Sequence, residues 1–324
     1  MLEAAVRAYR ATGADLPYGH PLAGHPGVTL ESWSWRLVDP ATRTVVLLAA
    51  TAVAEVGGVW LSVVLVARHA DGSRSVVERA LGEVRSSPRS LAVEAGNGRF
   101  SATPGRLVLD LGPDAQLDVH IEEPFGWPRR ALGGLGLGHV VPGLSQYWHP
   151  HLLGGTVRGR AVFGSRTVAL DGATAYGEKN WGRSGIPRAW WWGQATCAPE
   201  VVLAFAGGTL DVGPARVPAT AVAVRVGDGL AAFSPPLALI SCRMGPRTWA
   251  LDARSARWRV RVRATAEGEP FDLPVPVPGE QRTELLSHQH QDGELALTVW
   301  RDGRRRFAGT TSLAGLERGG RGLT

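Results

Sequence analysis

The chain has 324 residues, of which 44% are hydrophobic and 20% are charged, and its formal net charge is +6. This length allows one large domain or two ordinary ones, and the hydrophobic share excludes a disordered chain. The 42 glycines and 22 prolines argue against a helical bundle, and two cysteines are too few for a disulfide framework.

The first twenty residues lack a basic start followed by an apolar stretch, so the sequence favours a cytoplasmic protein over a secreted one. Residues 45–67 are apolar enough to resemble a membrane span. Glu55 and the pair Gly57-Gly58 interrupt this stretch where a hairpin would bend. We therefore expect two buried strands and no transmembrane span, and peripheral contact with a membrane stays open.

Apolar and polar residues alternate with a period of two along most of the chain, which is typical of half-buried strands. Only residues 1–10 and short stretches such as 75–85 look helical. We predict an all-β fold of two antiparallel barrels or sandwiches, with a first half over 1–170 and a second over 171–324. The Gly- and Pro-rich stretch 123–150 is a linker or a loop that covers a pocket. The predicted strands are 28–38, 44–53, 58–67, 106–111, 117–122, 155–163, 166–170, 189–196, 201–206, 220–226, 247–251, 257–265, 294–300 and 306–311.

The basic surplus does not indicate a nucleic-acid partner, because the arginines are spread along the polar sides of alternating segments. The densest run, Arg304-Arg305-Arg306, follows Asp302-Gly303, which is a hairpin signal. A solvated hairpin face is favoured over a phosphate-binding tract. We expect no nucleic-acid partner.

The most unusual segment is 176–194, YGEKNWGRSGIPRAWWWGQ. It contains Lys179, the only lysine in a chain that otherwise uses arginine, and Asn180, one of two asparagines. Because lysine and arginine differ in shape and hydration, this position could require an ammonium group. The segment also holds four of the twelve tryptophans.

This segment resembles the tocopherol cyclase family, whose members carry a similar Glu-Lys-Asn-Trp-Gly run followed by a Trp-rich strand that ends near Gln. The resemblance continues in Leu30-Glu31-Ser32-Trp33-Ser34-Trp35, in Tyr147-Trp148-His149, and in Gly293 through Trp300 and Leu316-Glu317. It covers nearly the whole chain in patches. The matching residues of the central run are Tyr176, Glu178, Lys179, Asn180, Trp181, Gly182, Pro187, Trp190, Trp192 and Gln194.

The resemblance implies two tandem lipocalin-like halves, related in architecture to carotenoid 1,2-hydratase, that enclose a hydrophobic, isoprenoid-like small molecule. It implies an isomerase of the intramolecular lyase class that closes a prenylated hydroquinone into a chromanol ring without a cofactor. Two other functions stay open. One is a non-catalytic carrier of a hydrophobic ligand, and the other is a hydratase or pericyclase on the same scaffold.

Such a ring closure needs an acid that protonates a trisubstituted alkene, and a carboxylic acid does this best when burial raises its pKa. Glu178 is the first candidate. If 176–181 is extended, Tyr176, Glu178 and Asn180 share one face, and Lys179 and Trp181 share the other. Alternation does not decide whether Glu178 or Lys179 faces the pocket. The alternative to a catalytic role is a buried polar cluster that joins the two halves.

Tryptophan faces attract a carbocation and exclude water, so Trp190 and Trp192 are candidate substrate-binding residues together with Tyr176, Trp181 and Gln194. Filling of the core is the competing interpretation for these rings and for Trp35 in the first half.

The two His-x-His pairs, His149/His151 and His288/His290, resemble metal ligands, but no cysteine or carboxylate lies at a supporting spacing. We therefore expect no metal, and we keep His149 as a further candidate for substrate binding.

Overall fold

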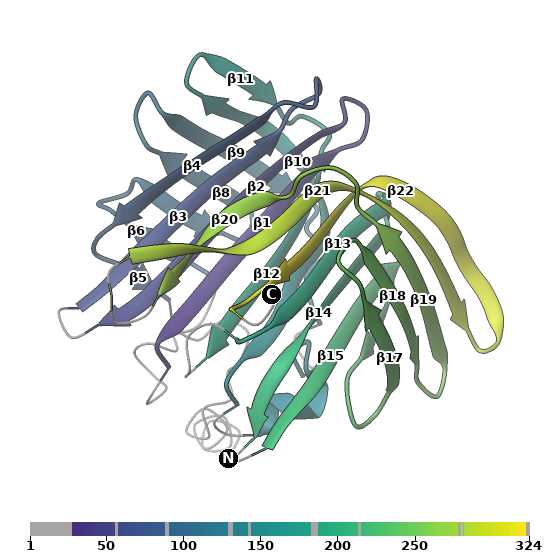
Figure 1. The fold of residues 1–324 in the computed structure, drawn as a ribbon. Coiled ribbons are helices and arrows are strands. Elements are labelled where there is room, and N and C mark those ends of the chain that lie inside the picture. The colour runs from purple at the N-terminus through teal and green to yellow at the C-terminus, as the bar shows by residue number, and fades with distance from the viewer. Residues whose placement is uncertain are drawn as a thin grey trace, which may run out of the picture. The chain divides into compact units, whose positions relative to one another are not determined.

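The structure is a computed structural model that describes residues 28–55, 58–87, 91–128, 132–141, 144–182, 187–212, 215–277, 280 and 282–321. The chain forms two compact units, each built around its own antiparallel sheet (Figure 1). Unit 1 comprises Met1–Pro128, Val140–Ile186 and Pro276–Glu284, and unit 2 comprises Arg129–His139, Pro187–Val275 and Leu285–Thr324. Both units are therefore discontinuous in sequence, and the division into halves at residue 170 stays a prediction.

The first sheet has twelve strands, in the order β4-β3-β2-β1-β12-β10-β9-β8-β7-β6-β5, with β11 paired to β10. The strand β12 is the last of this sheet in chain order but lies between β1 and β10, so it joins the two parts of the sheet. The strands are β1 (Leu30–Asp39), β2 (Thr44–Glu55), β3 (Gly58–Arg68), β4 (Arg74–Leu81), β5 (Arg85–Ser86), β6 (Val93–Ala95), β7 (Phe100–Thr103), β8 (Arg106–Asp110), β9 (Ala115–Glu122), β10 (Tyr147–Phe163), β11 (Arg166–Ala169) and β12 (Thr174–Gly182).

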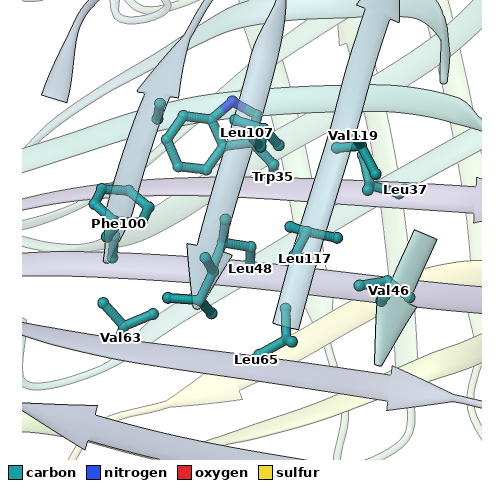
Figure 2. Packing of buried hydrophobic residues seen from close by; sticks show 14 of the residues in the cluster. Trp35, Leu37, Val46, Leu48, Val63, Leu65, Phe100, Leu107, Leu117 and Val119 are labelled. Atoms are coloured by element: carbon teal, nitrogen blue, oxygen red, sulfur yellow. The ribbon is translucent and has the colours of Figure 1, made fainter. Parts of the chain in front are cut away.

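One face of this sheet encloses the core of unit 1. The sheet curls so that the end of β4 comes next to the end of β6, where the backbone N–H of Gly96 donates to the carbonyl oxygen of Gly82 at 2.8 Å. Alternate residues of β1, β2 and β3 then meet alternate residues of β7, β8 and β9 across the interior (Figure 2). This enclosed side is called the core face below. The labelled residues in that view are Trp35, Leu37, Val46, Leu48, Val63, Leu65, Phe100, Leu107, Leu117 and Val119.

The second sheet has ten strands, in the order β16-β15-β14-β13-β22-β21-β19-β18-β17, with β20 paired to β21. Its core is lined by alternate residues such as Phe205, Val260 and Leu297, all fully buried or nearly so. The strands are β13 (Trp190–Ala198), β14 (Val201–Val212), β15 (Ala215–Val226), β16 (Gly229–Phe233), β17 (Leu239–Met244), β18 (Thr248–Arg254), β19 (Trp258–Thr265), β20 (Phe271–Val277), β21 (Arg282–Arg301) and β22 (Arg304–Gly319).

The all-β prediction is confirmed, and the apolar stretch 45–67 is the hairpin of β2 and β3, with Glu55 paired to Gly58. The hairpin signal Asp302-Gly303 is also confirmed, because both residues have positive φ and connect β21 to β22. In the stretch 123–150, a short 3-10 helix covers Gly136–Val140, and β10 already begins at Tyr147.

The helical prediction for 75–85 is wrong, because this stretch contains β4 and pairs with β3 from Leu61↔Leu81 to Arg68↔Arg74. Pairing with a neighbouring strand outweighs the helical preference of a short segment that contains Glu, Arg, Ala and Leu. The helix predicted for residues 1–10 lies outside the described residues. In the part of the chain that the structure describes, no helix is long and apolar enough to cross a membrane.

Candidate functional site

Lys179 lies on the core face of unit 1. It stands opposite Trp33 of β1 and His149 of β10 in the two ladders that flank β12. Its Nζ atom is 2.7 Å from Oε1 of Glu31, and both side chains are buried, with 1% and 0% of their surface exposed. Ionised side chains are buried only when they are paired, so Glu31 provides the charge that keeps this ammonium group in the core. The sequence alone did not single out Glu31.

Aromatic rings surround this ion pair. Nζ of Lys179 lies 4.9 Å from the centre of the Trp181 ring and 5.9 Å from that of Trp33. Tyr147 stacks on Trp181 at 5.3 Å and holds its plane. The negative faces of indole rings attract a cation, and this attraction is stronger in a desolvated site.

Two histidines share the core face with Lys179. His149 is fully buried, and its ring lies 5.2 Å from Trp127. His151 lies in a bulge of β10, and the centre of its ring is 5.9 Å from that of Trp35. Burial, followed by the positive charge of Lys179, lowers the pKa of His151 to about 3, so its imidazole is neutral near pH 7.

Nε2 of His151 has no hydrogen-bond partner among the described residues. Within those residues, no group of three or more histidines, cysteines, aspartates and glutamates is arranged to hold a metal ion.

Glu178 faces the opposite side of the same sheet and accepts three hydrogen bonds. Its Oε2 accepts from Nε1 of Trp148 at 2.8 Å and from the hydroxyl of Tyr176 at 2.6 Å. Its Oε1 accepts from Nδ2 of Asn180 at 3.0 Å. On this side of β12, Glu178 is a buried carboxyl group that accepts hydrogen bonds from two aromatic side chains and an amide, while Lys179 pairs with Glu31 on the other side.

The remaining predicted residues belong to unit 2. Trp190, Trp192 and Gln194 lie on the face of β13 that points away from the core of that unit, as the opposite alternation of Ala195 shows. Trp192 stands opposite Glu317 of β22. Glu317 is a second carboxyl group bound by three neutral donors. They are Nε1 of Trp190, Oγ of Ser287 at 2.9 Å and Nε2 of Gln289 at 2.9 Å.

The structure therefore divides the predicted site residues into three groups. Lys179, Trp181, His149 and Trp35 lie on the core face of unit 1. Tyr176, Glu178 and Asn180 lie on the opposite face of that sheet, and Trp190, Trp192 and Gln194 lie in unit 2. Sequence reasoning did not select Trp148 or Glu317 as site residues. Both belong to stretches that carried the family resemblance, which was the available signal.

A surface groove of about 620 Å³ on unit 1 contains none of these residues. Its walls come from β8 to β11 and include Asp110, Asp118, His120 and Arg160. Charged walls of this kind do not suit an isoprenoid chain.

The sequence model described as tocopherol cyclase-like matches residues 114–320, which is more than half of the chain. The chain belongs to the tocopherol cyclase-like family. The matched region contains both carboxyl groups that are bound by three donors, Glu178 and Glu317, and it contains Lys179 but not Glu31. A comparison with curated protein sequences finds no match.

Several solved structures share the fold of this chain over most of its length. A crystal structure of CghA with Sch210972 has a TM-score of 0.60 at 11% identity and covers 91% of this chain and 89% of that one. Kievitone hydratase from Nectria haematococca has a TM-score of 0.54 at 10% identity, with 94% of each chain covered. A putative AttH from Nitrosomonas europaea has a TM-score of 0.53 at 14% identity and covers 94% of this chain and 96% of that one. At these identities the likeness shows the fold.

Proposed function

We propose that this protein is a cofactor-independent cyclase that acts on a prenylated hydroquinone or a similar isoprenoid by alkene protonation and phenol attack. Membership of the tocopherol cyclase-like family supports this reaction class. The observation that carries the proposal is the placement of Glu178. This carboxyl group is 4% exposed, is held by Trp148, Tyr176 and Asn180, and is not the ion-pair partner of Lys179.

In the proposed reaction, protonated Glu178 transfers its proton to the less substituted carbon of the alkene. The π electron pair forms the new C–H bond and leaves a tertiary carbocation. A lone pair of the phenol oxygen then forms the C–O bond that closes the ring, and the phenol proton returns to the Glu178 carboxylate. Atoms and electrons balance without an oxidant or reductant, so the product is an isomer of the substrate.

The residues around Glu178 position the carboxyl group and surround it with aromatic rings. The three donors fix the orientation of the carboxyl group, and such positioning lowers the entropic part of the activation barrier. The rings of Trp148 and Tyr176 lie next to the proton donor, where their faces can stabilise a cation and exclude water. In this proposal Asn180 orients the polar head group, and Trp190, Trp192 and Gln194 remain candidate substrate-binding residues.

A second arrangement places the substrate on the core face, with Lys179 as the acid. It is favoured by the Nε2 atom of His151, which has no hydrogen-bond partner among the described residues. The charge of the buried Lys179 ammonium group acts on this imidazole, and the rings of Trp33 and Trp181 lie beside that ammonium group. In this arrangement His149, Trp181 and Trp35 contact the substrate. The two arrangements differ in which side of β12 carries the reaction, so single substitutions separate them.

The test is incubation with a prenylated hydroquinone in heavy water, followed by mass spectrometry of the product. We expect one deuterium on carbon in the chromanol ring, loss of turnover in Glu178→Gln, and retained turnover in Lys179→Met if that variant folds. Glu122→Gln, at an exposed carboxylate bound to Arg158, is the matched control and retains activity.

The other outcomes each contradict the proposal. Unchanged turnover in Glu178→Gln removes Glu178 from the acid role, and loss confined to Lys179→Met supports the core-face arrangement. Incorporation of solvent oxygen indicates a hydratase, and turnover that needs no acid indicates a pericyclase. Tight binding without any product indicates a carrier.

A further inference from the structure

The outward face of one part of the second sheet is strongly basic. Along β19, Val260 and Val262 point into the core, and the arginines that alternate with them point outward. Neighbouring strands add further arginines in register, because Arg254 stands opposite Arg259, and Arg305 stands opposite Trp300. The arginine face, as we define it, consists of Arg243, Arg254, Arg259, Arg261, Arg263 and Arg305, all exposed.

Few carboxylates neutralise this face. Asp252 bonds to Arg261 at 3.0 Å and to Arg263 at 2.7 Å, and Glu294 stands opposite Thr265 at the end of β19. Six arginines against two carboxylates give the face a net charge of +4. An outward face of unit 1 differs, because two of its arginines are paired: Arg106 bonds to Asp118, and Arg158 bonds to Glu122. The surplus of positive charge is therefore a property of this part of the second sheet.

A tryptophan orders two of these guanidinium groups. The Cζ atoms of Arg259 and Arg261 lie 5.2 and 6.0 Å from the centre of the Trp300 ring. Stacking on an aromatic face holds a guanidinium plane while its N–H groups remain directed outward. Planar guanidinium groups presented in this way match the paired oxygens of a phosphate.

Exposed leucines lie at the edge of the arginine face. Leu239 begins the edge strand β17 and stands opposite Arg254, and 78% of its surface is exposed. Leu237, two residues earlier, is 69% exposed. Large apolar side chains next to a basic surface are what a protein uses to enter the boundary between lipid headgroups and acyl chains.

We propose that the arginine face, with Leu237 and Leu239, docks unit 2 on a membrane surface that contains anionic phospholipid. The arginines bind the headgroup phosphates, and the two leucines enter the apolar boundary beneath them. A nucleic acid would satisfy the arginines but would leave the leucines without apolar partners, so the lipid surface fits the whole patch better. The proposal depends on charge and exposure alone and stands apart from the proposed cyclase reaction.

The experiment is co-sedimentation of the full chain with vesicles of phosphatidylcholine, with and without phosphatidylglycerol. We expect binding only when phosphatidylglycerol is present, and release at high salt, because the screening length falls well below its value of about 10 Å at 0.1 M. The variant Arg243→Gln/Arg254→Gln/Arg305→Gln removes three arginines of the face that form no ion pair with any residue the structure describes. Each basic residue contributes about fivefold to such binding, so the triple variant should bind about 100-fold more weakly.

A second triple variant, Arg106→Gln/Arg158→Gln/Arg160→Gln, makes the same change in net charge on unit 1 and should bind vesicles like the unchanged protein. Leu237→Ser/Leu239→Ser should weaken binding about tenfold or more while the arginines remain. Circular dichroism of each variant shows that the fold is kept.

Three results would overturn the proposal. The first is equal binding to vesicles with and without phosphatidylglycerol. The second is an equal loss of vesicle binding in the two triple arginine variants. The third is binding to a single-stranded oligonucleotide that depends on the arginine face, together with unchanged vesicle binding in the leucine variant. Because vesicle binding is measured without turnover, failure of the docking proposal and failure of the cyclase proposal are distinguishable.

Discussion

The ion pair between Lys179 and Glu31 should show strong energetic coupling in a double-mutant cycle. The perturbations are Lys179→Met, Glu31→Met and both together, which exchange charged side chains for apolar ones of similar volume. At 2.7 Å and an effective dielectric constant of about 20, the attraction between two unit charges is about 6 kcal/mol. Because both groups are buried, the loss of hydration offsets most of this attraction.

Either single substitution leaves one charged group in the core without its counter-ion, and this should lower the free energy of unfolding by about 3–5 kcal/mol. The double variant removes both charges, so its free energy of unfolding should lie within about 1–2 kcal/mol of the unchanged protein's. The expected coupling energy is therefore at least about 4 kcal/mol, which is large for two residues in contact.

The assay is urea unfolding followed by far-ultraviolet circular dichroism, because Trp33 and Trp181 lie beside Lys179 and would change the fluorescence directly. The exposed pair Arg158–Glu122 provides the matched control, at a similar distance of 2.8 Å. Solvent screens that pair, so its coupling should be far smaller. Equal coupling in the two cycles, or additive effects of Lys179→Met and Glu31→Met, would refute the reasoning.

Two further predictions concern the core face beside this pair. Gly177→Ala should lower the free energy of unfolding, measured with urea, by about 1–3 kcal/mol, because the added Cβ would lie 2.6 Å from Cε1 of His151 and 2.9 Å from Cδ1 of Trp35. The control is Gly82→Ala, which should leave the urea midpoint nearly unchanged because no atom lies within 4 Å of the added Cβ. His151 should make the protein less stable as the pH falls from about 6.5, because the unfolded chain binds a proton there while the folded chain, with a pKa of about 3, does not. This proton linkage amounts to about 2 kcal/mol between pH 6.5 and 5, and urea unfolding of His151→Leu across that range should show a correspondingly smaller slope. An identical slope in both proteins would contradict the neutral, buried imidazole.

The period of two was sufficient to predict the fold class, because half-buried antiparallel strands alternate regardless of which strands pair. It also predicted correctly that Glu178 and Lys179 lie on opposite faces. It could not show which of them faces the core. Both sides of β12 are largely buried, so the apolar residues do not distinguish one side from the other.

The partner of Lys179 was equally inaccessible from the sequence. Glu31 lies in the first strand, far away along the chain, and the two residues meet only because β12 inserts next to β1. The same holds for Trp148 and Glu178, which come together through the pairing of β10 with β12. Contacts of this kind depend on strand order, which alternation within each strand does not contain.

The surroundings of Lys179 give a physical reason for the one lysine in a chain rich in arginine. An ammonium group is a compact charge with three donors, whereas a guanidinium group is a wider plane with five. The space beside Glu31 is bounded by the rings of Trp33 and Trp181, which attract a cation through their faces but accept few hydrogen bonds. A guanidinium group buried there would have more donors to satisfy than one carboxylate can accept. The core therefore favours lysine on grounds of stability alone, so its retention at this position does not require that it take part in catalysis.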